Sequence, residues 1–149
     1  MKIARIEQFF PARRIRLVKV TTDDGLVGWG ETTLEGKPKS VHAAVEELAE
    51  YLIGKDPLRI EHHWQHIYRS AFFRGGNVLM TALSGIDQAL WDIAGKCHNA
   101  PVHKLLGGAV RDRLRVYAHW GVRDMSSAGL DAARRRLEQL QRSGYTAYK

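Results

Sequence analysis

The sequence predicts an α+β fold: a three-stranded antiparallel meander, then a helical bundle, then the start of a parallel β/α unit. Three observations predict it. Apolar residues alternate over residues 2–33 around an Asp-Gly turn. A long helical repeat of apolar residues fills residues 78–97. After Gly107-Gly108 the pattern changes to strand, helix and strand, so we expect domains at residues 1–110 and 111–149.

The meander is expected from strands at residues 2–10, 14–22 and 26–33. Pro11 and the residues that follow it are expected to end the first strand and separate it from the second. The second strand is rich in β-branched residues, and the Asp-Asp-Gly turn at residues 23–25 supplies the positive φ that a tight hairpin needs. Gly28 and Gly30 do not follow the order of a dinucleotide-binding loop, so we expect them to permit close packing.

Three helices are expected next, at residues 40–53, 56–69 and 78–97. Ser40 suits the N-cap of the first, and Pro57 lies near the first turn of the second. The third has one apolar face and is expected to form the centre of the core. That face comprises Leu79, Leu83, Ile86, Leu90, Ile93 and Cys97.

The remaining elements are shorter. A helical turn follows Pro101 and stops at Gly107. Beyond it we expect a strand at residues 114–118, a helix capped by Ser126 or Ser127 that runs to about residue 142, and a strand at residues 145–149.

The composition narrows the class of protein. The chain has 149 residues, of which 44% are apolar and 26% charged, as in a soluble globular protein. No stretch approaches ~20 apolar residues, no leader is visible, and the single cysteine fits a reducing cytoplasm.

The net charge of +7 is concentrated in residues 111–149, which hold 9 Lys/Arg and 4 Asp/Glu. Because no nucleic-acid-binding motif accompanies this charge, we expect a solvated face and neither a nucleic-acid nor a membrane partner; a nucleic-acid binder stays an alternative.

Several side chains are chemically capable of catalysis or metal binding. His62 and His66 lie one helical turn apart, a spacing that can hold zinc, but no third ligand accompanies them and we expect solvated or capping histidines. Asp87 and Asp92 lie about 140° apart around their helix, so they do not converge on one atom. We expect them to bind neighbouring backbone or a cation such as Lys96, and we expect Cys97 to pack in the core.

Two segments place cations beside constrained or flexible backbone. Arg13, Arg14 and Arg16 surround the break between the first two strands, where they either bind an anion through bidentate hydrogen bonds or form a solvated turn. Residues 72–76, Phe-Phe-Arg-Gly-Gly, combine aromatics, a cation and glycines just before the long helix. They either face a site or connect two helices.

A longer pattern spans residues 82–107. It contains Ile86-Asp87-x-Ala89-Leu90-x-Asp92 and Gly95-Lys96, followed by Pro101-Val102 and Leu105-Leu106-Gly107. This arrangement resembles a signature of the mandelate racemase/muconate-lactonizing family of the enolase superfamily. Residues 25–31, 51–57 and 73–76 resemble, more narrowly, the acid-sugar dehydratases of that family, with the galactonate dehydratases nearest. The resemblance covers nearly the whole chain and is weakest at about residues 120–141.

The resemblance implies an α+β capping domain over residues 1–110, then the first strand–helix–strand of a truncated TIM-like (β/α) barrel over residues 111–149. In this family the barrel carries the acid/base residues and three acidic ligands for Mg²⁺, which stabilises the enediolate formed by proton removal next to a carboxylate. A dehydratase then expels water and gives a 2-keto-3-deoxy acid. The chain would supply the lid of such a lyase. No catalytic residue or metal ligand is carried over, so we expect the chain alone to be inactive and to bind no metal.

The cap of this family selects the substrate through the loops after its first and third strands, here residues 11–16 and 31–39. By resemblance, Arg14, Glu31 and Arg74 are the expected substrate-binding residues, and His119 and Trp120 would lie at the carboxyl end of the first barrel strand. We expect a small sugar acid as partner, a cytoplasmic location and a homo-oligomer. The alternatives are a racemase or cycloisomerase of the same family, or a non-catalytic truncated module that acts through oligomerisation.

Overall fold

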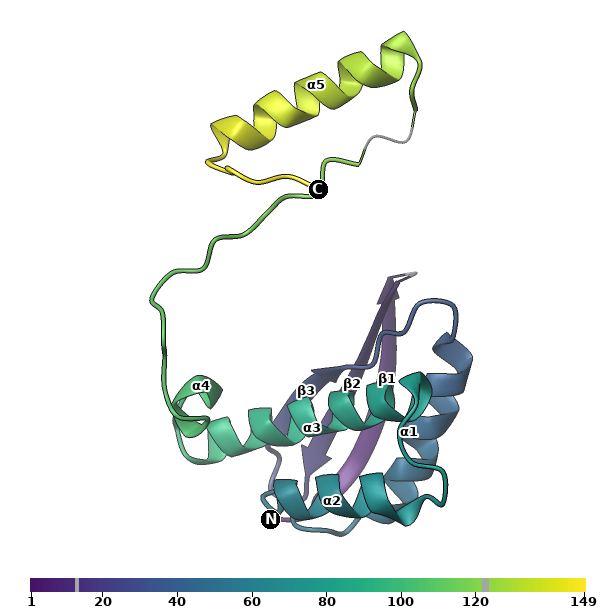
Figure 1. Ribbon diagram of the computed structural model, residues 1–149. Helices are drawn as coiled ribbons and strands as arrows, with labels where there is room; N and C mark the ends of the chain where they lie inside the picture. The colour runs from purple at the N-terminus through teal and green to yellow at the C-terminus, as the bar shows by residue number, and fades with distance from the viewer. Residues whose placement is uncertain (13, 122–123) are drawn as a thin grey trace. The chain divides into compact units, whose positions relative to one another are not determined.

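The computed structural model describes residues 1–12, 14–121 and 124–149. The chain divides into two compact units, Met1–Gly108 and Ala109–Lys149, each of which is described by itself. In the first unit, helices lie against one face of a three-stranded sheet (Figure 1). This is the predicted α+β arrangement.

The sheet is a meander of β1 (Ile3–Ala12), β2 (Ile15–Thr22) and β3 (Val27–Glu31), in the order β1-β2-β3 and antiparallel throughout. The predicted turn joins β2 to β3, where Gly25 has a φ of +89°. The alternation of the strands directs one set of side chains toward the helices, so Val18 and Val20 of the central strand are fully buried.

The predicted interruption of the first strand at Pro11 is wrong, because β1 continues through Pro11 to Ala12. β1 lies at the edge of the sheet, where a proline removes no necessary ladder hydrogen bond. The pairing is locally irregular between Phe9 and Ala12, which accommodates the ring.

Four helices follow in the first unit: α1 (Pro38–Leu52), α2 (Ile60–Ser70), α3 (Asn77–Cys97) and the single turn α4 (Val102–Leu105). Two predicted starts are wrong. α1 begins at Pro38 and not after Ser40, since proline fits the first helical position. α2 begins three residues after Pro57, because the Asp56 carboxylate accepts the Leu58 N–H at 2.9 Å and forms a turn there.

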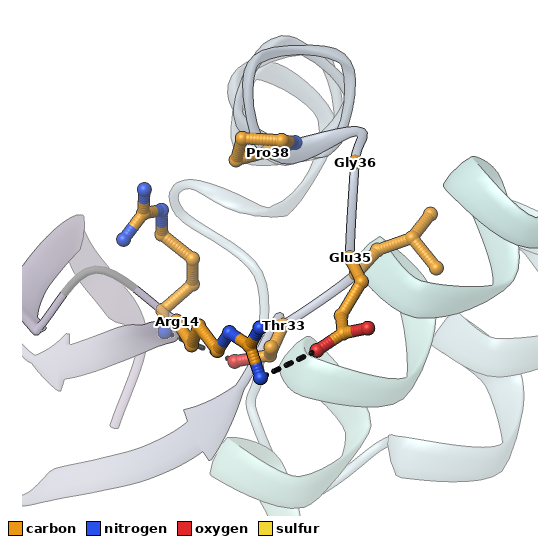
Figure 2. A pocket seen from close by; sticks show the side chains of 7 residues that line it. Arg14, Thr33, Glu35, Gly36 and Pro38 are labelled. Carbon is orange, nitrogen blue, oxygen red and sulfur yellow. Dashed lines mark hydrogen bonds and ion pairs between the residues drawn. The ribbon is translucent and has the colours of Figure 1, made fainter. Parts of the chain in front are cut away.

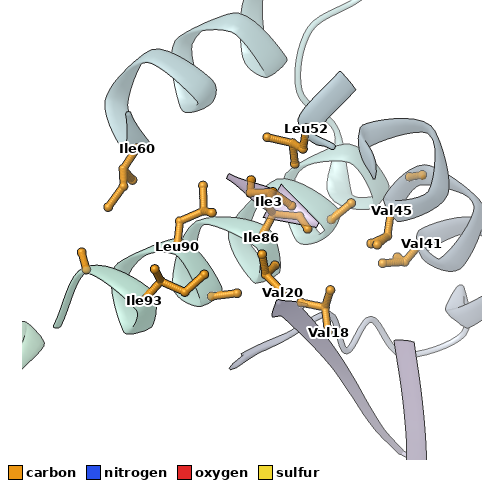
Figure 3. Close-up of a cluster of buried hydrophobic side chains, with 14 residues drawn as sticks. Ile3, Val18, Val20, Val41, Val45, Leu52, Ile60, Ile86, Leu90 and Ile93 are labelled. Carbon is orange, nitrogen blue, oxygen red and sulfur yellow. The ribbon is translucent and has the colours of Figure 1, made fainter. Parts of the chain in front are cut away.

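The core of this unit lies between α3, α1 and the sheet (Figure 3). α3 contributes more residues to it than any other element, and its buried side chains include Leu83, Ile86, Leu90 and Ile93, as predicted. Two residues of the predicted face differ. Leu79 is 39% exposed and Cys97 is exposed, since both lie near the ends of the helix. The prediction that Cys97 packs in the core is therefore wrong.

Three glycines bring β3 and α3 into backbone contact. A Cβ on Gly28 would overlap the carbonyl oxygen of Ala89, and one on Gly30 would overlap that of Gly85. A Cβ on Gly85 would in turn collide with the side chain of Thr32. The predicted close-packing role of Gly28 and Gly30 is confirmed, and Gly85 is its counterpart on the helix.

Polar side chains of α3 also occupy the free edge of β3. Lys96 Nζ donates to the Val27 carbonyl at 2.6 Å, the Trp29 N–H donates to Asp92 at 2.9 Å, and the Glu31 N–H donates to Gln88 at 3.0 Å. The spacings match, because four helical residues advance about 6.0 Å and two strand residues about 6.7 Å. α3 therefore serves β3 in place of a fourth strand, and we call this contact the β3–α3 seam.

The second unit contains one helix, α5 (Ser127–Arg142), within its described residues. Ser126 is its N-cap and accepts the Gly129 N–H at 3.2 Å, which is one of the two predicted caps. The predicted strands at 114–118 and 145–149 do not form as strands. They meet in a single parallel bridge between Ala118 and Tyr148, because neither segment has a second neighbour to extend the ladder.

Gly30→Ala should lower the free energy of unfolding by about 3 kcal/mol, since its methyl group would force the backbones of the seam apart. Gly36→Ala is the matched control: its φ of +76° disfavours alanine, but nothing lies within 4 Å of the new methyl. That strain alone costs about 1 kcal/mol. Urea unfolding followed by circular dichroism measures both. Equal losses would contradict the seam.

Asp92→Leu should cost about 1–3 kcal/mol, because it leaves the Trp29 N–H without its acceptor. Asp92→Asn retains an acceptor oxygen and loses only the ion pair with Lys96. The two charged atoms of that pair lie 2.7 Å apart, and because both side chains are partly exposed the pair contributes below about 1 kcal/mol. Thermal unfolding and amide exchange at Trp29 distinguish the two variants. Faster exchange at Trp29 in the leucine variant alone is expected, and the same exchange in both would contradict edge capping.

Candidate functional site

The two predicted substrate-selecting loops lie together around one hollow of about 370 Å³ (Figure 2). Arg14 and Arg16 border it from the β1–β2 turn and the start of β2, while the β3–α1 connection contributes the other wall. The residues on that wall are Thr33, Leu34, Glu35, Gly36 and Pro38. The hollow therefore combines cationic, hydroxyl, carboxylate and apolar groups.

An ion pair crosses this hollow from loop to loop. Arg14 Nη1 lies 3.5 Å from Glu35 Oε1, and their side chains are 75% and 76% exposed (Figure 2). A pair so exposed is weak, so either partner is available to a ligand. Sequence reasoning named Arg14 but not Glu35, which lies inside the predicted loop 31–39 without a distinguishing motif.

Arg16 has a different task from Arg14. Its Nη1 donates to the carbonyls of Ala12 at 3.1 Å and Ile15 at 3.0 Å, and its guanidinium lies 4.6 Å from the centre of the Phe10 ring. Its backbone N–H donates to the Thr33 hydroxyl at 3.0 Å. Arg16 thus holds the turn and joins it to the second loop. Arg13 lies outside the described residues.

Glu31 lines a second, more open hollow of about 460 Å³. This hollow shares Thr33 and Leu34 with the first, and its other wall is the amino-terminal half of α3. The polar groups on that wall are Asn77, Thr81, Ser84 and Gln88. Glu31 and Arg14 therefore line adjoining hollows and not a single one.

Arg74 lines neither of these two hollows. It is exposed in the connection between α2 and α3, beside Phe72 and Phe73, which are 92% and 84% exposed. The structure does not bring Arg74 together with Arg14 or Glu31. Its assignment as a substrate contact stays a prediction that rests on the resemblance alone.

Of the three histidines of α2, one is buried and hydrogen-bonded within the fold, and the other two are exposed. His62 and His66 are exposed, and the nearby positive charge of Arg59 is the largest cause that lowers the pKa of His62. His63 is buried, with Nε2 2.8 Å from the Asp56 carbonyl and Nδ1 3.0 Å from the Tyr51 hydroxyl. Because a carbonyl only accepts, Nε2 carries the proton and Tyr51 donates to Nδ1.

The two aspartates of α3 do not face one substrate. Asp92 accepts the Trp29 N–H and pairs with Lys96, so its predicted structural role is confirmed. Asp87 is half-buried, and burial followed by the charge of Glu61 raises the pKa of its carboxyl. Two carboxyl groups with separate surroundings do not form an acid/base pair.

The described residues hold no group of three or more His, Cys, Asp or Glu side chains close enough to share a metal ion. Of the helices in the described part of the chain, none combines the length and the apolarity that a membrane crossing requires.

Residues 10–107 match the family described as mandelate racemase / muconate lactonizing enzyme, N-terminal domain. The meander, the helices and the long signature on α3 agree with this match. The chain belongs to that family, and the predicted resemblance is confirmed.

Two curated relatives give a narrower comparison than the family match. The chain is 56% identical over 117 residues to proteins named D-galactonate dehydratase from Xanthomonas axonopodis pv. citri and Xanthomonas campestris pv. campestris. The match covers 78% of this chain and 31% of each relative. The chain thus spans about a third of the length of these curated relatives.

Solved structures agree in fold. An enolase from Agrobacterium radiobacter with bound Na and L-malate superimposes with a TM-score of 0.86 at 37% identity, over 99% of this chain and 38% of that one. An enolase from Pantoea ananatis with bound D-gluconate and Mg gives a TM-score of 0.83 at 37% identity, over 99% of this chain and 35% of that one. The α+β capping domain followed by the start of a barrel is therefore the fold of this chain.

Asp87→Asn should stabilise the chain at neutral pH. Because the pKa of Asp87 is raised in the folded state above its ordinary 3.8, its contribution to stability is present below pH 3.8 and is lost as the pH rises through the raised pKa. The variant avoids that loss, so its advantage should vanish near pH 4. Chemical unfolding from pH 4 to 7 measures it. Glu50→Gln, an exposed carboxyl on α1, is the control, and an equal gain there would contradict the prediction.

Proposed function

We propose that this chain is the substrate-selecting lid, with the first strand–helix–strand of the barrel, of a Mg²⁺-dependent acid-sugar dehydratase. The observation that carries the proposal is the 56% identity to D-galactonate dehydratases, which extends over 78% of the chain. Residues 1–110 would form the cap and residues 111–149 the start of the barrel. The substrate would be a sugar acid such as galactonate.

In this proposal the hollow between the two loops receives the part of the substrate that lies away from the reacting carbon. Arg14 donates hydrogen bonds, Glu35 accepts them, and Arg16 holds the turn that presents Arg14. Glu31 in the adjoining hollow is a further contact, and Arg74 is retained as a candidate from the resemblance. These groups bind and orient the substrate; none is proposed to move a proton.

The chemistry itself would belong to the rest of the barrel. A dehydratase of this kind removes the proton next to the carboxylate and then expels a β-hydroxyl as water. When bound, Mg²⁺ supplies charge stabilisation for the acid that loses its proton. The described residues do not fit a magnesium site, so the ion would be held outside them, and the chain alone would be inactive.

The test uses two proteins. The 149-residue chain should form no 2-keto-3-deoxy acid from D-galactonate and Mg²⁺. A fusion in which this chain replaces the matching segment of the Xanthomonas campestris D-galactonate dehydratase should form it. In that fusion, Arg14→Gln should raise KM about tenfold, the loss of a hydrogen bond to a charged donor. Arg5→Gln, an exposed arginine on β1, is the matched control.

Other results would favour the alternatives. A fusion that racemises or cycloisomerises its substrate without loss of water would indicate another activity of the family. An isolated chain that forms a defined oligomer in light scattering, together with an inactive fusion, would favour the non-catalytic module. Activity of the isolated chain would overturn the assignment of catalysis to the remaining barrel.

A further inference from the structure

We infer that Glu35 determines specificity in this hollow, favouring sugar acids whose far end carries a hydroxyl over diacids whose far end carries a carboxylate. The inference rests on the proposed function, since it takes the reacting carboxylate to lie in the barrel and the other end of the substrate to face the cap. It concerns which second group the hollow accepts.

The composition of the hollow makes Glu35 the deciding charge. Of the described residues that line it, Glu35 alone carries a carboxylate, while Arg14 and Arg16 carry positive charge. Glu35→Gln would therefore convert a hollow of mixed charge into a wholly cationic one. Among the described residues that line the hollow, Glu35 is the one whose neutralisation removes a negative charge.

The two arginines are not equally available to a ligand. Nη1 of Arg16 is committed to two carbonyls, and its guanidinium lies on Phe10. The Arg14 side chain is highly exposed, and its Nη1 forms an ion pair with Glu35 Oε1 at 3.5 Å. The group that would meet the far end of a substrate is therefore the Arg14–Glu35 pair, and a ligand carboxylate would have to compete with Glu35 for the Arg14 guanidinium.

A hydroxyl and a carboxylate differ in what they offer such a pair. A hydroxyl both donates and accepts, so it can accept from Arg14 and donate to Glu35 at once. An ionised carboxylate only accepts, so it gains from Arg14 but is repelled by Glu35. The pair therefore fits the hydroxyl end of a galactonate-like acid better than the second carboxylate of a diacid.

The first test uses the 149-residue chain and two probes, galactitol, which ends in hydroxyls, and galactarate, which ends in carboxylates. Amide shifts of Thr33 and Gly36 are followed by nuclear magnetic resonance to tens of millimolar probe. Glu35→Gln should raise the apparent affinity for galactarate about two- to fivefold, the range for an exposed charge pair, and should not raise that for galactitol.

Glu50→Gln is the control, because it removes one exposed negative charge on α1 and should leave both affinities unchanged. Arg14→Gln should weaken the binding of both probes. An unchanged ratio of the two affinities in Glu35→Gln would overturn the inference. So would the absence of a response to either probe in every variant, since the hollow would then not be a binding site.

The second test uses the fusion with the Xanthomonas campestris barrel. Glu35→Gln should raise the ratio of kcat/KM for galactarate to that for galactonate about two- to fivefold. An active fusion with an unchanged ratio would overturn the inference and leave the proposed function standing. A fusion that dehydrates neither acid would contradict the proposed function, while the titrations of the chain would still judge the role of Glu35.

Discussion

The first unit depends on the seam between β3 and α3. Glycines remove side chains from both elements where they meet, so the contact is between backbones, and three helix side chains complete the hydrogen bonding of the strand. The chemistry of that row fixes the register. Gln88 and Asp92 present acceptors to two N–H groups, and Lys96 presents a donor to a carbonyl. A slide of the helix by one turn would set Asp92 against the carbonyl of Val27, acceptor against acceptor, or Lys96 against the N–H of Trp29. Sheet edges commonly invite further strands, and here the helix occupies that edge.

The seam also explains where the hollow forms. β3 is held on α3 up to Glu31, and the chain then continues into the connection to α1. The Thr32 N–H donates to the Arg16 carbonyl at 2.8 Å, and the Arg16 N–H donates to the Thr33 hydroxyl. These two bonds tie the connection to the start of β2. The two loops are thus joined at their bases by these two hydrogen bonds, while the side chains of Arg14 and Glu35 remain in solvent.

Much of this fold was predictable from sequence because its signals are local. The turn at residues 23–25, the apolar face of α3 and the cap of α5 depend on neighbours in the chain. The failures came from context. Pro11 was expected to end the first strand, but β1 lies at the edge of the sheet and continues through it. The helix expected to begin at Asp56-Pro57 begins later, because the Asp56 carboxylate accepts the Leu58 N–H and forms a turn there.

For the site, arginines near a turn suggested anion binding. Only the structure distinguishes Arg16, which donates to backbone carbonyls, from Arg14, which forms an ion pair with a carboxylate. The partner of an exposed ion pair between two loops has no signature in sequence, so Glu35 was found only in space.

One consequence follows from the division between seam and hollow. The most distinctive residues of the chain, the glycines and the Gln-Asp-Lys row, are occupied with architecture, whereas the groups that would contact a ligand lie on loops with ordinary composition. Within the family signature at residues 82–107, Gly85, Asp92 and Lys96 thus have structural roles, and no residue of the signature lines the hollow between the two loops. The signature therefore does not include the residues that would contact a ligand in this hollow. Substitutions at those loop residues would leave the seam between β3 and α3 unchanged.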